Sequence, residues 1–218
     1  MAGSVPGTVS VEDAGAPTPG ALGEYARISI AFTVDRILEV TLAHGGLGGI
    51  VLTETPVADP YVKDYDAIKG AGPTRWARHF DVSNWGLTWA HRDGARAGGA
   101  VIAFRTPGVH MLGGRDDVAV LWDIRVAPGQ RGTGVGSALF RAAEGWAAAR
   151  GCGWLKIETQ NVNAAACRFY QRMGCTLGAV DRFAYPELPG EVQLLWWKAL
   201  PVAGEVVGQP SQPPPGRA

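Results

Sequence analysis

Apolar and polar positions alternate along much of the chain between residues 28 and 198, and this pattern predicts short β-strands. The pair Asp93-Gly94 stands between two such stretches and predicts a tight hairpin. Residues 60–66 (PYVKDYD) break the alternation and predict a loop with an acidic rim. Strands are predicted over residues 28–34, 50–53, 85–91, 99–104, 118–126, 154–159, 176–185 and 191–198.

Two other stretches repeat apolar residues at helical spacing. The first carries Leu139 and Trp146 on one face and ends at Gly151. The second begins near Asn163 and ends before Gly174. Because one of these helices connects neighbouring strands, the order of elements predicts an α/β fold.

The two ends of the chain lack periodicity. Residues 1–23 are rich in Gly, Ala and Pro and predict a flexible N-terminal tail. Residues 201–218 contain the run QPSQPPPG and predict a disordered C-terminal tail, because such a segment cannot build a packed element. A single folded domain is therefore expected over residues 24–200.

Charge and composition narrow the function classes. The chain has 20 Lys and Arg against 20 Asp and Glu, which argues against a dedicated nucleic-acid binder. No apolar run approaches the ~18–20 residues that a membrane helix needs, and no signal peptide is evident, so a cytoplasmic protein is expected. The three cysteines have no histidine at zinc spacing, so no metal site is expected. A homodimer is left open.

A glycine-rich loop, Arg131-Gly132-Thr133-Gly134-Val135-Gly136, joins the strand over 118–126 to the first predicted helix. Backbone N–H groups at a helix N-terminus favour phosphate, and glycines let the backbone curl around the anion. A Walker loop would need a lysine that the chain lacks, and a dinucleotide fingerprint would need glycine at Ser137. A turn without a ligand remains the alternative.

The loop resembles the acetyl-CoA pyrophosphate loop (Arg-x-x-Gly-x-Gly) of the GCN5-related N-acetyltransferase (GNAT) superfamily. Residues 123–128 (DIRVAP) precede it as the family's fourth strand does, and residues 163–174, with Asn163, Phe169-Tyr170 and Gly174, are similar to a downstream family motif. The resemblance implies a GNAT fold, a mixed and mostly antiparallel twisted sheet with splayed central parallel strands flanked by helices.

One subgroup resembles more of the chain. Residues 158–170 (ETQNVNAAACRFY), the segment 60–65 and the spacing of Asp181 and Tyr185 are similar to the streptothricin acetyltransferases. This resemblance extends over residues 25–198 and implies an antibiotic amine as the acceptor.

For the cofactor, the resemblance implies that backbone groups of Ile124 and Val126 pair with the pantetheine arm of acetyl-CoA. Backbone N–H groups of residues 131–136 would hold the pyrophosphate, with charge added by Arg131. Asn163 would bind the pantetheine or cap the helix that follows.

The chemistry requires a base and an acid. A lysine-like amine is neutral in only about one molecule in 2,500 at pH 7, so direct attack on a thioester needs a proton acceptor. The resemblance makes Tyr170 the proton donor to the departing thiolate. Glu158 is the preferred base, as in ribosomal-protein N-terminal acetyltransferases, with Asp123 and Asp181 as alternatives. The related streptothricin enzymes tend to carry an acid where this chain has Trp122.

For the acceptor, an acidic pocket with aromatic walls is expected, since carboxylates and aromatic faces both attract cations. Asp123 is expected to face the other side of the sheet from Val120 and Trp122, because side chains alternate along a strand. Buried cysteines, including Cys167, are expected to pack rather than react. The residues expected to line the pocket are Tyr61, Asp64, Tyr65, Asp66, Asp181 and Tyr185.

The sequence therefore predicts an acetyl-CoA-dependent N-acetyltransferase that acts on a primary amine of a small basic molecule by direct attack in a ternary complex. Two alternatives stay open: a protein N-terminal acetyltransferase of the ribosomal-protein type, and a non-catalytic acyl-CoA-binding module.

Overall fold

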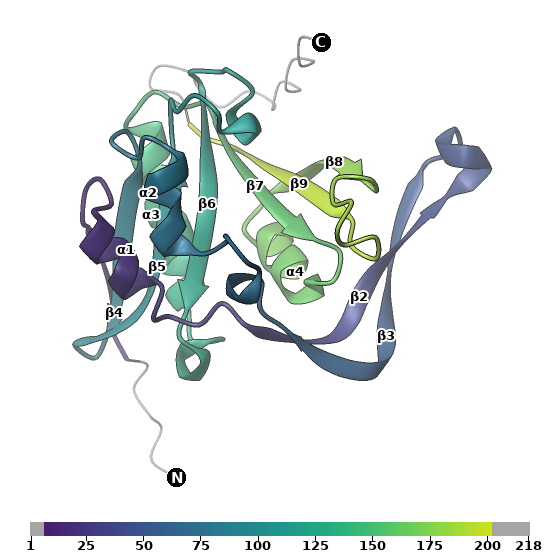
Figure 1. Cartoon of the computed structure of the whole chain (residues 1–218), viewed down its shortest axis with the longest axis horizontal. Helices are drawn as coiled ribbons and strands as arrows, with labels where there is room; N and C mark the ends of the chain where they lie inside the picture. The colour runs from purple at the N-terminus through teal and green to yellow at the C-terminus, as the bar shows by residue number, and fades with distance from the viewer. Residues whose placement is uncertain (1–6, 202–218) are drawn as a thin grey trace.

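The fold is built on one twisted sheet of seven strands in the order β1-β4-β5-β6-β7-β9-β8 (Figure 1). A computed structural model describes residues 7–201 of the chain. The sheet strands are β1 (Val9–Asp13), β4 (Gly86–Arg92), β5 (Ala95–Ala103), β6 (Val118–Val126), β7 (Trp154–Gln160), β8 (Thr176–Asp181) and β9 (Gln193–Ala199). The helices are α1 (Pro19–Tyr25), α2 (Pro73–His79), α3 (Val135–Ala148) and α4 (Ala164–Arg172).

The sheet is mixed and mostly antiparallel, as predicted. Within residues 7–201 only β6 and β7 pair in parallel, and α3 is the crossover between them. Their ladder covers only residues 118–121 against 154–157, although both strands continue beyond it. The second halves of β6 and β7 therefore diverge, and the gap between them is the splay that the family resemblance implied.

A β-bulge in β6 changes which side chains face which side of the sheet. Opposite β5, Asp123 pairs with Val101 and Leu121 pairs with Ile102, so Trp122 is the extra residue. Val120 lies on the α1 and α2 side, and after the bulge Arg125 also lies on that side, over the Tyr25 ring. The expectation that Asp123 faces away from Val120 and Trp122 is therefore wrong, because simple alternation does not hold across a bulge.

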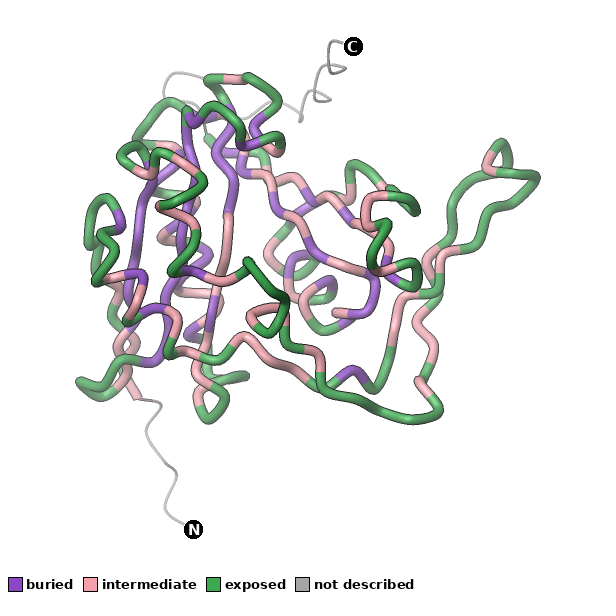
Figure 2. The backbone as a smooth tube through the Cα atoms, in the orientation of Figure 1, coloured by how far each residue is buried: buried purple, intermediate pink, exposed green. Residues whose placement is uncertain are grey.

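Helices cover both faces of the sheet, and each face has its own core. Buried residues concentrate in the strands at the centre of the sheet (Figure 2). On one face α3 and α4 pack on the sheet through Leu139, Phe140 and Tyr170. On the other face Trp122 packs among the rings of Trp76, Phe80 and Trp85. The remaining members of this second core include Tyr25, Leu87, Trp89, Val101, Val118 and Val120.

Residues 9–13 and 19–23 are not part of the flexible tail that was expected over residues 1–23, and residues 1–6 lie outside the described residues. Residues 9–13 form β1, which pairs with β4 at the edge of the sheet, and α1 follows with Thr18 as its N-cap. Leu22 and Tyr25 of α1 are fully buried. Amphipathic packing of so short a helix leaves little periodicity in the sequence, so composition alone misled the prediction. The C-terminal tail expected over 201–218 lies, apart from Pro201, outside the described residues.

Strands β2 (Phe32–Leu42) and β3 (Ile50–Lys63) form a separate two-stranded arm that projects from the body of the molecule (Figure 1). Both strands are longer than predicted, and β3 includes residues 60–63, which were expected to be a loop. The arm docks where Leu38 exchanges two hydrogen bonds with Asn161, which follows β7. Within residues 7–201 no helix is long and apolar enough to cross a membrane.

Candidate active site

The glycine-rich loop presents a row of free backbone donors at the start of α3. Among residues 7–201, no backbone or side-chain acceptor takes a hydrogen bond from the amides of residues 132–136. Gly132 and Gly134 adopt φ values of +76° and +92°, which side chains other than glycine rarely adopt. Gly134 is the N-cap of α3 and offers no capping side chain, so the helix N-terminus is open to an anion.

The open edge of β6 supplies the second part of the site. The amide of Ala127 donates to the Ala97 carbonyl of β5 at 2.8 Å, so by alternation the backbone groups of Ile124 and Val126 point the other way, into the gap. Arg131 closes part of this edge, since its Nε donates to the Val126 carbonyl at 3.2 Å. Its Nη2 donates to the Ser29 carbonyl at 3.2 Å. Arg131 is thus engaged with backbone while remaining exposed.

Asn163 and Cys167 lie at the start of α4. The Asn163 side-chain oxygen accepts from the Ala166 amide at 3.0 Å, so Asn163 is the N-cap of α4, and its side-chain NH₂ group has no partner among the described residues. Burial raises the pKa of Cys167 to about 12, which keeps this thiol protonated and unreactive at neutral pH.

Tyr170 of α4 is buried on the α3 and α4 face of the sheet. Its ring packs against Phe140 and Phe169, and the residue is 6% exposed. Burial, with the nearby Asp123 carboxylate as the next cause, raises the pKa of Tyr170 far above its ordinary value. The hydroxyl has no hydrogen-bond partner among residues 7–201, so it is a protonated donor that the fold itself does not use.

Glu158 of β7 follows the last residue that pairs with β6, and its side chain lies on the opposite face of the sheet from α3 and α4. It follows Lys156, which lies over the Trp197 ring, and the two side chains share one face of the strand. The Tyr185 hydroxyl donates to Glu158 Oε1 at 2.6 Å, and Gln160 Nε2 donates to that hydroxyl at 2.9 Å. Glu158 forms no ion pair within the described part of the chain. The Tyr185 hydroxyl therefore fixes the position of the Glu158 carboxyl group, and no described cation pairs with it.

Asp123 lies in a buried cluster beside the gap. Arg125 Nε donates to Asp123 Oδ2 at 2.8 Å, and the same guanidinium forms a two-fold hydrogen bond with the Asp66 carboxylate, at 2.5 and 2.8 Å. The Arg125 side chain is 1% exposed. Burial raises the pKa of Asp123 to about 6, against the opposing effect of Arg125. Two carboxylates thus share one cation, which leaves the cluster with a net negative charge when both are ionised.

A carboxylate that the sequence did not single out lies on the acceptor side. Glu191, in the loop before β9, accepts a hydrogen bond from the Tyr65 hydroxyl at 2.7 Å and pairs with Lys63. Burial and Glu191 raise the pKa of Tyr65 well above its ordinary range. Tyr65 and Tyr185 are close enough to influence each other electrostatically, so the two tyrosine–carboxylate pairs belong to one cluster. Glu191 stands alone in a proline- and glycine-rich loop, where no pattern marks it.

Of the other residues expected to line the acceptor pocket, some lie near the two tyrosine–carboxylate pairs and others do not. Tyr61 is 43% exposed and contributes to the raised pKa of Tyr65. Asp66 does not line an open pocket, because Arg125 takes its carboxylate. Asp64 accepts from the Asp66 amide and caps the short turn that follows β3. Asp181 is exposed on the edge strand and accepts from the Phe183 amide at 2.8 Å, and it forms no hydrogen bond or ion pair with the other candidates.

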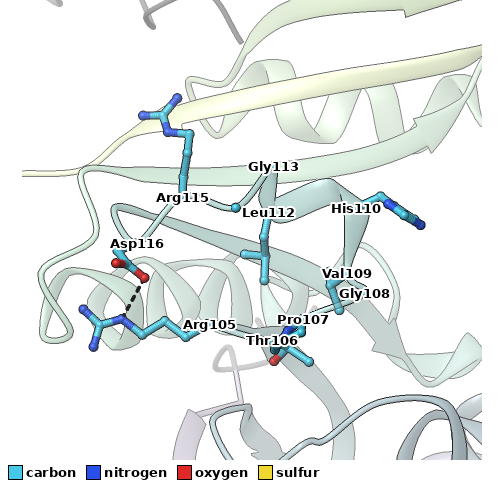
Figure 3. A pocket seen from close by; sticks show the side chains of 11 residues that line it. Arg105, Thr106, Pro107, Gly108, Val109, His110, Leu112, Gly113, Arg115 and Asp116 are labelled. Carbon is cyan, nitrogen blue, oxygen red and sulfur yellow. Dashed lines mark ion pairs between the residues drawn. The ribbon is translucent and has the colours of Figure 1, made fainter. Parts of the chain in front are cut away.

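One hollow in the described part of the chain lies away from these residues. It measures about 540 Å³ and is formed by the β5–β6 loop, at the opposite end of β6 from the glycine loop (Figure 3). Its Arg105 pairs with Asp116, and its Arg115 pairs with Asp117. No group of three or more His, Cys, Asp and Glu side chains within residues 7–201 is placed to hold a metal ion.

A family model described as the acetyltransferase (GNAT) family matches residues 56–175, and the chain belongs to that family. A streptothricin acetyltransferase of Streptomyces lavendulae is 29% identical over 183 residues, which cover 84% of this chain and 91% of the relative. The crystal structure of a nourseothricin acetyltransferase is 29% identical, covers 88% of this chain and 99% of its own, and has a TM-score of 0.66.

The crystal structure of a Bacillus anthracis protein shares the fold, with a TM-score of 0.67 and 23% sequence identity. The match covers 88% of this chain and 100% of the Bacillus anthracis chain. That protein, assigned provisionally as a streptothricin acetyltransferase, is in complex with acetyl coenzyme A. The predicted family, fold and cofactor are thus confirmed. The chain is an acetyl-CoA-dependent N-acetyltransferase, and the free amides of the glycine loop and the open edge of β6 fit this coenzyme.

Proposed function

We propose that the chain acetylates a primary amine of a small, positively charged antibiotic of the streptothricin kind. The likeness to a streptothricin acetyltransferase over 84% of the chain carries this proposal, because it extends beyond the cofactor motifs into the acceptor side. The acceptor side supports it independently. Glu158 has no cationic partner among residues 7–201, and the Asp123–Arg125–Asp66 cluster has one carboxylate in excess.

Coenzyme binding is assigned to backbone more than to side chains. The amides of residues 132–136 bind the pyrophosphate at the N-terminus of α3, where the helix dipole adds to the attraction. Ile124 and Val126 pair with the pantetheine arm as an additional strand would. Asn163 caps α4 and offers its free NH₂ group to the same arm. Arg131 orders this region by fixing the Val126 carbonyl and the Ser29 carbonyl.

The proton transfers are assigned to groups from opposite faces of the sheet. Glu158 receives the proton that the acceptor ammonium must lose before it attacks, either directly or through water. Tyr170 donates its proton toward the departing thiolate, since burial keeps its hydroxyl protonated at neutral pH. Asp123 is the alternative base, because its carboxylate lies close to Tyr170 and its pKa of about 6 lies near the working pH.

Recognition of the acceptor is assigned to the aromatic and acidic cluster. Tyr61, Tyr65 and Tyr185 offer ring faces to a cation, and Tyr185 also holds Glu158 in place. Asp181, exposed at the edge of the sheet, adds negative charge to the rim. Acetylation removes the positive charge of the amine, so the product is released from a site built to attract cations.

The test is a thiol-release assay with acetyl-CoA and a panel of acceptors: streptothricin, an aminoglycoside, a polyamine and peptides with free N-termini. We expect release with streptothricin at a kcat/KM well above the other acceptors. Preference for peptides would instead support a protein N-terminal acetyltransferase. Coenzyme binding in calorimetry without thiol release for any amine would refute the enzymatic proposal.

A further inference from the structure

A short segment that begins at Lys63, the last residue of β3, is held at both of its ends by residues on either side of the splayed strands. Lys63 and Tyr65 contact Glu191, which precedes β9 and lies beyond the end of β7. The next residue, Asp66, is bound by Arg125 of β6. Residues 63–66 therefore run from the β7–β9 side of the gap to the β6 side, and we call this segment the strap. It precedes α2 in the chain and lies between β6 and the base of the arm (Figure 1).

The anchor on β6 is stronger than a surface ion pair. Both Arg125 Nη atoms donate to Asp66, and the Arg125 side chain is 1% exposed while that of Asp66 is 27% exposed. Nη1 also donates to the Ile28 carbonyl, at 3.1 Å. A planar guanidinium that binds a carboxylate through two parallel hydrogen bonds fixes orientation as well as distance. The position of Asp66 is therefore set by β6.

The same arginine stands inside the cofactor strand. Arg125 lies between Ile124 and Val126, the two residues whose backbone groups face the gap. Its Nε donates to Asp123, whose charge raises the pKa of Tyr170. One side chain thus connects the coenzyme edge of β6 with the segment that carries Tyr65, the acceptor-side tyrosine.

We propose that the strap closes the acceptor side of the active site, and that Asp66 is a positioning residue that holds Tyr65 and Glu191 in register with the cofactor strand through Arg125. This rests on the proposed function of the site. Asp66 touches neither the amine nor the coenzyme in this arrangement. Its effect reaches the acceptor through the placement of the strap, so it should change acceptor affinity more than coenzyme affinity.

The decisive variant is Asp66→Asn, which keeps the shape of the side chain and removes the charge that Arg125 binds. We expect the KM for the amine acceptor to rise at least about tenfold, since small misplacements of substrate-positioning groups have effects of this size. The kcat at saturating acceptor and the Kd of acetyl-CoA should each stay within about twofold of the wild type. A merely structural role would not separate these three quantities.

The matched control is Asp117→Asn, at the opposite end of β6. Asp117 also accepts two hydrogen bonds from one arginine, Arg115, at 2.8 and 2.6 Å. It lies in the loop before β6, away from the glycine loop and the strap. We expect wild-type KM, kcat and Kd in this variant. An equal rise of acceptor KM in both variants would overturn the proposal, because the effect would then not be specific to the strap.

A second variant tests the other anchor and keeps the inference testable if Asp66→Asn does not fold. Tyr65→Phe removes the hydroxyl that donates to Glu191 and keeps the aromatic ring. It should raise the acceptor KM with little change in the Kd of acetyl-CoA. Unchanged acceptor KM in a folded Asp66→Asn or in Tyr65→Phe would overturn the strap. If the wild type itself acetylates no amine while it binds acetyl-CoA, the proposed function fails instead, and the two failures are thus distinguishable.

Discussion

Replacing Gly134 by alanine tests whether the conformation of the glycine loop is what binds the coenzyme. Gly134 has φ +92° and ψ −12°, and a Cβ atom built there meets no other atom within 4 Å. The cost of the new methyl group is therefore backbone strain rather than a clash. A residue with a Cβ in the left-handed region costs about 1–2 kcal/mol relative to glycine.

The assay measures the free energy of unfolding by denaturant, without coenzyme and at saturating acetyl-CoA. If the alanine variant keeps the native loop, both values fall by about 1–2 kcal/mol. If the loop instead relaxes in the free protein, its amides turn away from the coenzyme site. Coenzyme binding must then return the loop to the native conformation, so the Kd of acetyl-CoA rises about tenfold for each 1.4 kcal/mol of backbone strain. In either case the coenzyme-bound protein is less stable than the wild type by the full strain.

Gly129 provides the matched control within the same turn. It has no positive φ, and a Cβ there also meets nothing within 4 Å. Gly129→Ala should be neutral or stabilising by up to about 1 kcal/mol, because alanine restricts only the unfolded chain. Wild-type stability of coenzyme-bound Gly134→Ala would refute the argument, since the loop would then bind its ligand without the left-handed conformation.

Three further variants address the proton transfers. Tyr170→Phe should lower kcat by about 10²-fold, the usual scale for a lost general acid. The free energy of unfolding should change by less than about 0.5 kcal/mol, because the hydroxyl bonds to no described residue. A wild-type kcat in this variant would contradict the assignment. Glu158→Gln should lower kcat by about 10²-fold or more with an unchanged Kd for acetyl-CoA in calorimetry, and an unchanged rate would remove Glu158 from the mechanism. Asp123→Asn tests a pH effect whose sign follows from burial. Because the pKa of Asp123 is raised to about 6 in the folded protein, against about 3.9 in an unfolded chain, its contribution to stability is lost as the pH rises from about 4 to about 6. In urea denaturation, the free energy of unfolding of the wild type minus that of Asp123→Asn should fall by about 2–3 kcal/mol between about pH 4 and pH 6. If this difference stays constant or rises, the pKa of Asp123 is not raised in the folded protein.

The sequence predicted those parts of the structure that depend on neighbouring residues. The Asp93-Gly94 hairpin, a helix directly after the glycine-rich turn and a cap at Asn163, one of its two expected roles, each need only local chemistry, and the structure confirms all three, with α3 beginning inside the loop at Val135. The splay between β6 and β7 came from the family resemblance rather than from any pattern of residues.

The parts that the sequence missed depend on distant segments. The bulge at Trp122 became visible only in the register between β5 and β6, and without it Asp123 was placed on the wrong face. Arg125 and Asp66 are 59 positions apart, and Lys63 and Glu191 are 128 positions apart. Such pairs follow from the topology of the sheet and the docking of the arm, for which a single sequence carries no direct signal.

The break in the β6–β7 ladder explains how one sheet can hold both substrates. Where two parallel strands separate, backbone groups that would otherwise pair with each other become available to a ligand, so the coenzyme can occupy the place of a strand. The same separation leaves the second halves of β6 and β7 without each other as neighbours. Tyr170 of α4 packs on one face of the sheet, and Glu158 of β7 accepts from Tyr185 on the other face. Under the proposed assignment, the proton donor and the proton acceptor would act from opposite faces of the sheet and would not neutralise each other.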